Sequence, residues 1–305
     1  MGVLFRSLSR REFGQAAIGL GAAALASPHA KAAAGSLITK PIPKSGEPMV
    51  AVGLGTARVF DRANEKTRQS AQSVIEALVG GGGRLIDTAS TYGDAERVLG
   101  DVIGSTGLRE KVFIATKLEE PDPAELKRSQ TRLKMDSFDL LQLHNVSEGK
   151  QSLARFREWK AQGICRYTGI TSTYHADFPA VEAMLRREKP DFVQVDYSLD
   201  NRVAEKRILP LAAEVGAAVL TALPLGRSRL FRAVRDKTLP EWAAEFDAHS
   251  WAQFFLKFLI GHPAVTAVIP GTANPAHMTD NLGATYGRLP DSAQRRRMVE
   301  YVESL

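Results

Sequence analysis

Residues 112–144, VFIATKLEEPDPAELKRSQTRLKMDSFDLLQLH, contain the pattern that decides the fold. An apolar run at 112–117 is typical of a buried strand, and a second such run follows at 138–144. Between them, the residues from Asp122 to about Lys134 have the periodicity of an amphipathic helix. A strand, a helix and a second strand in this order predict two parallel strands whose connecting helix covers the sheet.

The same alternation recurs on both sides of this stretch. Further apolar runs that predict strands lie at 49–56, 84–89, 166–171, 192–197, 217–223 and 265–269. Helical patterns lie at about 65–79, 94–103, 151–161, 179–187, 203–215, 250–260 and 275–283, and a last one at about 290–303. The polar stretch 225–247 has no assigned element.

Eight strand–helix units of this length predict a closed (β/α)8 TIM barrel, an α/β fold, in a single domain over residues 35–305. An open doubly wound sheet is the alternative, and it would need a G-x-G-x-x-G fingerprint after the first strand. Gly53-Leu54-Gly55 lacks the third glycine of that fingerprint, so the barrel is favoured.

Composition narrows the classes of protein further. A hydrophobic content of 44% over 305 residues supports a full globular core. The single cysteine, Cys165, excludes an internal disulfide and a cysteine-rich metal site, and we expect no metal. No apolar run is long enough for a permanent membrane span. Half of the net charge of +6 lies in residues 1–34, so the remainder does not indicate a nucleic-acid partner.

Residues 1–34 have the organisation of an export signal. A charged segment with Arg10-Arg11 before a phenylalanine precedes an apolar stretch rich in alanine and glycine at 16–26. Small residues follow, and we expect cleavage after Ala32 or Ala34. The paired arginines resemble the twin-arginine (Tat) motif, which implies recognition by the Tat export machinery and a periplasmic location. An amphipathic helix that stays on the protein is the alternative.

Four polar residues are expected to meet at the carboxyl ends of adjacent strands, where such barrels place their active sites. Asp87 ends the second predicted strand, Tyr92 follows in its loop, and Lys117 and His144 end the next two strands. Lys117 beside Asp87 would form an ion pair, and we expect its charge to lower the pKa of the Tyr92 phenol. Each residue alone has a structural explanation, but their convergence favours catalysis.

The segments DTASTYG (87–93), ATK (115–117) and LQLH (141–144) resemble the aldo-keto reductase superfamily. The resemblance implies reversible NAD(P)H-dependent reduction of an aldehyde or ketone, with a small-molecule carbonyl compound as the substrate and no metal. On this chain it implies Tyr92 as the general acid, Lys117 and Asp87 as the residues that tune it, and His144 as the residue that orients the carbonyl.

The resemblance also implies a nicotinamide dinucleotide site. The corresponding positions are Thr171, Ser172 and Gln194 for the carboxamide, Leu223 and Leu225 for the pyrophosphate, and Gly271, Thr272, His277 and Asn281 for the adenosine half. Ala222 stands where many relatives have a stacking tyrosine. Gly271 and His277 replace basic residues common in NADPH-preferring members, whereas Arg227 and Arg229 are spare cations. We expect NADP as the cofactor and leave NAD open.

Two other functions are compatible with the same residues. A non-catalytic or accessory nucleotide-binding barrel would explain export to a compartment where NADPH is not normally regenerated. A lyase or aldolase would use Lys117 as a Schiff base, but the Asp87–Tyr92 spacing and His144 disfavour it. We expect an open pocket walled by Val59, Phe60, Tyr92 and Glu119, with Trp242 and Phe246 anchoring their loop to the barrel.

Overall fold

A computed structural model describes residues 36–148 and 151–305, which contain an eight-stranded, all-parallel sheet whose strands pair in chain order. The strands are β3 (Leu54–Gly55), β4 (Leu85–Asp87), β5 (Phe113–Leu118), β6 (Phe138–Leu143), β7 (Cys165–Ser172), β8 (Phe192–Asp196), β9 (Ala218–Ala222) and β10 (Val265–Val268). The first and last strands meet, because Gly53 N–H donates to the Val268 carbonyl at 2.8 Å and Gly55 bridges Gly271. The predicted closed barrel is confirmed.

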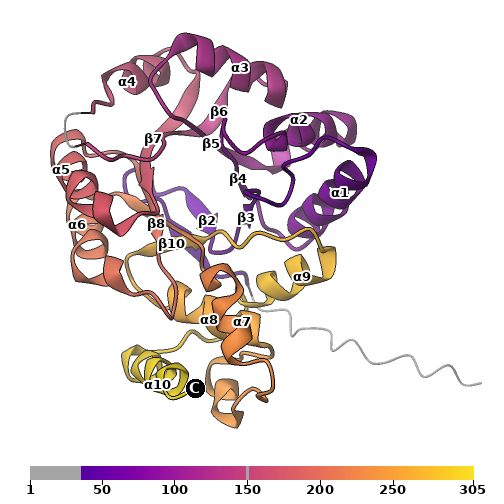
Figure 1. Cartoon of the computed structure of the whole chain (residues 1–305), viewed down its shortest axis with the longest axis vertical. Coiled ribbons are helices and arrows are strands. Elements are labelled where there is room, and N and C mark those ends of the chain that lie inside the picture. The colour runs from indigo at the N-terminus through magenta and orange to yellow at the C-terminus, as the bar shows by residue number, and fades with distance from the viewer. Residues whose placement is uncertain (1–35, 149–150) are drawn as a thin grey trace, which may run out of the picture. The chain divides into compact units, whose positions relative to one another are not determined.

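The helices form a ring around this barrel (Figure 1). They are α1 (Glu65–Gly80), α2 (Ala95–Thr106), α3 (Pro123–Leu133), α4 (Ala154–Ala161), α5 (Phe178–Glu188), α6 (Ile208–Val215), α8 (Trp251–Ile260) and α9 (Pro275–Gly283), followed by α10 (Ser292–Glu303). Side chains of Asn64, Asp122 and Ser250 cap the first turns of α1, α3 and α8. These caps satisfy amide groups that a helix leaves without partners, which is why the helices begin there.

The predicted strand at 49–56 is divided in the structure. Its first residues form β2 (Pro48–Val50), which pairs antiparallel with β1 (Thr39–Pro41), and only Leu54–Gly55 belongs to the barrel as β3. Ile42 and Met49 of this hairpin are buried in one cluster with side chains from β4 to β10. The hairpin therefore covers the amino-terminal end of the barrel, and the carboxyl end remains for a site.

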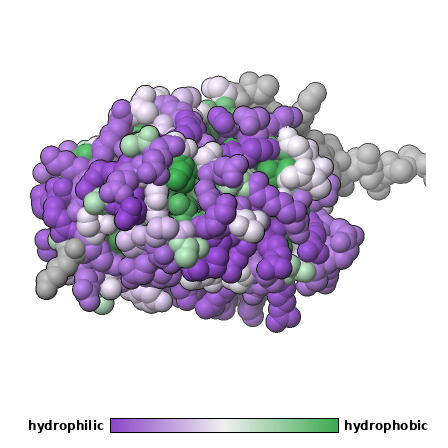
Figure 2. Space-filling model, turned by 90° about the horizontal axis from the view of Figure 1, so that it is seen from above, coloured by the Kyte–Doolittle hydropathy of each residue, from purple (hydrophilic) through white to green (hydrophobic). Residues whose placement is uncertain are grey.

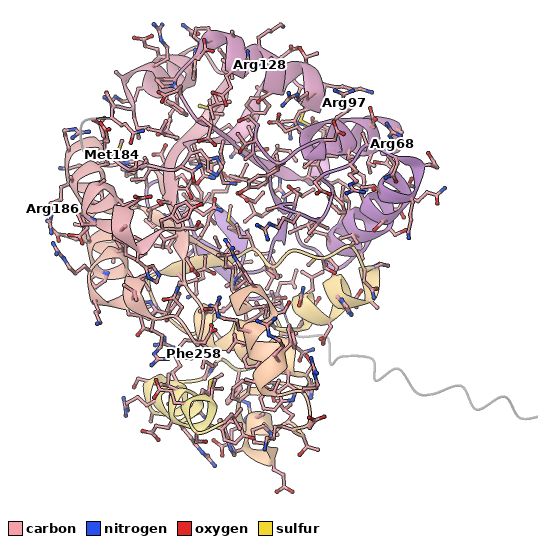
Figure 3. All side chains as sticks on the ribbon, in the orientation of Figure 1. Arg68, Arg97, Arg128, Met184, Arg186 and Phe258 are labelled. Atoms are coloured by element: carbon pink, nitrogen blue, oxygen red, sulfur yellow. The ribbon has the colours of Figure 1, made fainter. Side chains whose placement is uncertain are left out.

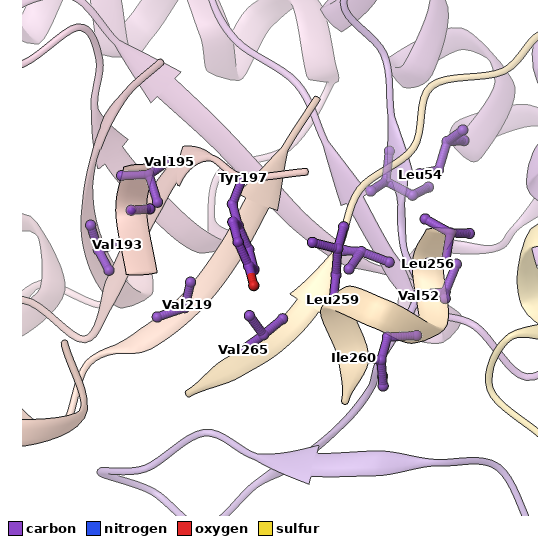
Figure 4. Close-up of a cluster of buried hydrophobic side chains, with 14 of the residues drawn as sticks. Val52, Leu54, Val193, Val195, Tyr197, Val219, Leu256, Leu259, Ile260 and Val265 are labelled. Carbon is purple, nitrogen blue, oxygen red and sulfur yellow. The ribbon is translucent and has the colours of Figure 1, made fainter. Parts of the chain in front are cut away.

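A second and larger apolar cluster lies between the barrel and its helices. Figure 4 shows the part under α8, where Leu259 lies toward Val265 of β10 and Leu256 lies toward Val52. Alternate residues of each strand face this layer because successive side chains in a strand point to opposite sides. The strands are thus buried on both faces, as parallel sheets require.

The stretch 225–247, to which the sequence assigned no element, contains short helices. Among them is α7 (Arg229–Ala233), followed by a 3₁₀ helix at Glu241–Phe246. The Trp242 ring lies 5.5 Å from Phe254 of α8 and 5.9 Å from Tyr301 of α10, measured between ring centroids. The prediction that Trp242 anchors this loop is confirmed, because its ring packs on helices outside the barrel.

The face of the molecule shown in Figure 2 is mainly hydrophilic. Arg68, Arg97, Arg128 and Arg186 extend outward from α1, α2, α3 and α5 (Figure 3). Basic residues are therefore spread over several helices. Within the described ranges, no helix is both long and apolar enough to span a membrane.

We predict that Gly100→Ala destabilises the protein by about 1–3 kcal/mol, because overpacking forces backbone shifts. A Cβ at Gly100 in α2 would lie 2.3 Å from the Arg132 carbonyl oxygen of α3. Gly104, one turn further along α2, has no atom within 4 Å of the corresponding Cβ position. Gly104→Ala is the matched control and should gain up to about 1 kcal/mol from helix propensity. Urea unfolding measures both, and equal stabilities of the two variants would contradict the assigned packing.

Candidate active site

Neighbouring strands bring the four predicted polar residues together at the carboxyl end of the barrel. Asp87 is the last residue of β4 and pairs in register with Ala115, two residues before Lys117 in β5. His144 follows β6 directly, and Tyr92 lies in the loop after β4. Parallel strands end at the same edge, so residues at their ends become neighbours even when distant in sequence.

The centre of this group is a buried ion pair. Lys117 Nζ donates to both carboxylate oxygens of Asp87, at 2.8 and 2.7 Å, and to the Thr88 carbonyl at 2.7 Å. The Lys117 side chain is 0% exposed and that of Asp87 is 3% exposed. Burial opposes the ammonium charge, but the contacts with Asp87 and Tyr92 outweigh it and raise the pKa of Lys117. Lys117 is therefore a charged ammonium, and Asp87 is its counter-ion.

Tyr92 lies against this charge. The Lys117 ammonium is 5.0 Å from the centroid of the Tyr92 ring, which also meets the His144 ring edge-on at a centroid distance of 5.7 Å. Burial raises the pKa of the Tyr92 phenol above its ordinary value, and Lys117 opposes this rise without overcoming it. The expectation that the pKa of Tyr92 falls below its ordinary value is wrong, because desolvation of the phenolate is a larger effect than the lowering by Lys117. Tyr92 is thus a protonated phenol at neutral pH.

His144 contacts an acidic residue that sequence reasoning treated only as pocket wall. Its Nδ1 is hydrogen-bonded to Oε1 of Glu119, which also accepts from Asn145 Nδ2 and from Thr91 Oγ1, each at 3.2 Å. Burial and the charge of Lys117 lower the pKa of His144 to about 4, although Glu119 opposes them. The imidazole is therefore neutral at pH 7. Glu119 stands two residues after Lys117, and this spacing is the sequence signal that could have identified Glu119 as a site residue.

The residues expected at the nicotinamide lie on the next strands. Gln194 Nε2 donates to Asp87 Oδ2 at 3.4 Å, and Gln194 Oε1 accepts from Gln142 Nε2 at 2.9 Å. Thr171 pairs in register with Gln194, and Ser172 Oγ donates to Asp177 at 2.6 Å. Gln194 thus connects the ion pair to Gln142, which sequence reasoning did not single out as a site residue.

The loop after β9 has an unusual backbone. Leu223 and Arg227 have φ of 53° and 49°, in the left-handed region. Arg229 Nε donates to Asp200 at 2.7 Å, so Arg229 is not the spare cation that the sequence indicated. Arg227 is exposed and has no ion pair with another residue in the described part of the chain. Leu225 packs against the main core.

The segment after β10 leads into α9. Gly271 bridges Gly55, and Thr272 Oγ1 accepts from Asn274 N–H at 3.0 Å ahead of the helix. His277 is exposed, whereas Asn281 is only 3% exposed. The Asn281 side chain makes no hydrogen bond with the other residues that the structure describes, so its amide is free to meet a ligand.

One expected wall residue is placed elsewhere. Phe60 is 0% exposed and belongs to the main apolar core, so it does not line a pocket; Val59 is half-buried beside it. Ala222 ends β9 and is 7% exposed. Across residues 36–148 and 151–305, no group of three or more acidic, histidine or cysteine side chains is arranged to hold a metal ion.

Comparison with known proteins places this geometry in context. Residues 51–296 match the model of the Aldo/keto reductase family. Methylglyoxal reductase YeaE of Escherichia coli is 31% identical over 76% of this chain and 84% of that protein. An aldo-keto reductase of Klebsiella pneumoniae, solved in complex with NADPH, is similar with a TM-score of 0.72 and 25% identity. That similarity covers 87% of this chain and 96% of the other.

We predict that Lys117→Met destabilises the protein by about 3–5 kcal/mol, because it leaves the Asp87 carboxylate buried without its partner. The double variant Asp87→Asn/Lys117→Met removes both charges and should recover part of that loss. Lys127→Met, at an exposed position of α3, is the control and should change stability by less than about 0.5 kcal/mol. Urea unfolding tests all three, and a wild-type stability of Lys117→Met would contradict the assigned ion pair.

Proposed function

Because this chain belongs to the aldo/keto reductase family, we propose that it reduces an aldehyde or ketone to an alcohol with NAD(P)H, reversibly, and that Tyr92 is the general acid. The observation that carries the proposal is the protonated Tyr92 phenol beside the buried Lys117–Asp87 pair. This arrangement combines a proton donor with a fixed positive charge that stabilises the anion left when the proton is given up.

The protein's own residues account for the proton half of the reaction. A bound reduced nicotinamide supplies the hydride that forms the new C–H bond at the carbonyl carbon. Tyr92 Oη gives its proton to the carbonyl oxygen, so that an O–H bond forms as the C=O π bond is lost. Lys117 stabilises the resulting phenolate, and Asp87 keeps Lys117 in place. Solvent then returns a proton to Tyr92, and the oxidation direction reverses these steps.

The residues present fit a dinucleotide. The amide of the buried Asn281 would meet the adenine. The exposed Arg227 stands in the loop where Leu223 and Leu225 would pass the pyrophosphate. Thr171, Ser172 and Gln194 lie at adjacent strand ends for the carboxamide. We propose NADPH as the preferred form. Arg227 and the NADPH complex of the Klebsiella pneumoniae relative support this preference. The lack of a basic side chain at Gly271 and of a lysine or arginine at His277 argues against it.

Fluorescence titration with NADPH and with NADH tests this cofactor assignment. Binding of NADPH more tightly than NADH is the expected result. Absence of binding by either would favour the accessory, non-catalytic barrel, since Gln194 is already engaged by Asp87 and Gln142 and Ala222 offers no stacking ring.

We also propose that residues 1–34 direct the folded protein to the periplasm through the Tat machinery. Arg10-Arg11, the short apolar stretch and the small residues before Gly35 support this, and they lie outside the described residues. A barrel without disulfides suits a route that exports folded protein.

We predict that Tyr92→Phe lowers kcat for carbonyl reduction by about 10²- to 10⁴-fold, the range of general-acid contributions, while NADPH affinity stays close to that of the wild type. The ring remains and only the proton donor is lost. Tyr167→Phe is the control, because its hydroxyl bonds Ser45 and Glu47 at the opposite end of the barrel. Steady-state kinetics on a panel of aldehydes and ketones measures the effect. Near-normal turnover by Tyr92→Phe would contradict the proposed mechanism.

For export, the full-length chain with Arg10→Lys/Arg11→Lys should lose most of its periplasmic fraction in a bacterium with a Tat system. Arg6→Lys keeps the charge upstream of the pair and serves as the control. Cell fractionation measures the distribution, and unchanged export of the double variant would reject the signal.

A further inference from the structure

In the hydrogen bond between Glu119 and His144, the carboxylate is the acceptor and the imidazole is the donor. Glu119 accepts hydrogen bonds from Asn145 Nδ2, at 3.2 Å on Oε1 and 3.0 Å on Oε2, and from Thr91 Oγ1 at 3.2 Å. Although burial works against its charge, the hydrogen bonds from Asn145 and Thr91 lower the pKa of Glu119. An ionised carboxylate has acceptors only. Its contact with His144 Nδ1 therefore requires the proton to be on that nitrogen.

The loop that carries Glu119 is held in place independently of His144. Glu125 Oε1 accepts from the backbone N–H of Glu119 at 3.1 Å, and Oε2 accepts from that of Glu120 at 3.2 Å. The same carboxylate accepts from Ser90 Oγ at 2.6 Å. Glu119 is thus fixed by groups on three segments of the chain, and it does not depend on the imidazole for its position.

A neutral imidazole carries one proton, so a proton on Nδ1 leaves a lone pair on Nε2. Lys117, Glu119 and Glu125 are the charged groups that act on this ring, and Tyr92 lies edge-on to it. Nε2 has no hydrogen-bond partner among residues 36–148 and 151–305. It is the ring nitrogen directed away from Glu119, and it is free for a substrate.

We propose that Glu119 is a positioning residue that holds His144 with its proton on Nδ1, so that Nε2 presents an acceptor to the substrate. The proposal rests on the function proposed above and replaces the carbonyl-orienting role that the resemblance implies for His144, because an unprotonated Nε2 cannot donate to a carbonyl oxygen. Tyr92 is then the donor to the carbonyl oxygen, and the second polar contact of the site accepts a proton from the substrate. A carbonyl compound with a hydroxyl group next to the carbonyl can accept from Tyr92 and donate to His144 Nε2. A simple ketone can only accept from Tyr92.

The tautomer can be measured without cofactor or substrate. Two-bond ¹⁵N–¹H correlation spectra of histidine-labelled protein distinguish protonated from unprotonated ring nitrogens, and loss of signals in His144→Gln assigns them. We expect Nδ1 of His144 to be protonated and Nε2 to be unprotonated at pH 7. The reverse assignment in the wild type would overturn the proposal, and this result does not depend on any variant folding.

The substrate consequence is measured with hydroxyacetone and butanone, which differ by a hydroxyl in place of a methyl group. The ratio of their kcat/KM values should fall about five- to tenfold from wild type to Glu119→Leu, the effect of one lost hydrogen bond. Comparing the ratio between proteins cancels the intrinsic reactivity of the two ketones. Glu120→Gln changes a neighbouring carboxylate without a side-chain contact in the described chain and should leave the ratio unchanged.

An unchanged ratio in Glu119→Leu would reject the positioning role. If the wild type reduced neither ketone nor any other carbonyl compound, the proposed reductase function would fail, while the spectra would still decide the tautomer of His144. The two hypotheses are therefore separable.

Discussion

The buried ion pair between Lys117 and Asp87 is the interaction on which the rest of the site depends. Two charges without solvent are costly unless their geometry is close and their remaining hydrogen bonds are satisfied. The Thr88 carbonyl and the Gln194 amide supply such bonds here. That arrangement exists only because β4 and β5 are adjacent parallel strands in the observed register. The pair in turn sets the field at Tyr92, and the charge of Lys117 adds to burial in keeping His144 neutral.

The two ends of the barrel have different roles: one end stabilises the fold, and the other holds the candidate active site. At the amino-terminal end, the β1–β2 hairpin covers an apolar interior to which nearly every barrel strand contributes. At the carboxyl end, polar side chains replace this apolar filling and leave strand ends and loops to form a site. Gly53 and Gly55 lie where the first strand meets the last, and Gly55 has a backbone oxygen of Ile269 2.8 Å from its Cβ position. A side chain at Gly55 would hold the closing strands apart.

The electrostatics of the site determine which groups are hydrogen-bond donors and which are acceptors. Burial keeps the Tyr92 phenol protonated although a lysine lies beside it, and burial together with the charge of Lys117 leaves His144 with a single ring proton. Family membership alone does not determine these states. They follow from the neighbours of each titratable group, and Glu119 and Asn145 are neighbours that do not belong to the four predicted polar residues.

The sequence by itself determined the periodic strand–helix alternation, and with it the barrel, because hydrophobic period is a local property of the chain. It also placed Asp87, Lys117 and His144 at strand ends, since those positions follow from where each apolar run stops. Only the tertiary structure decided the split of 49–56, the helices within 225–247, the burial of Phe60 and the direction of the Tyr92 pKa. Each of these depends on desolvation and on contacts between residues far apart in the chain, which no local pattern records.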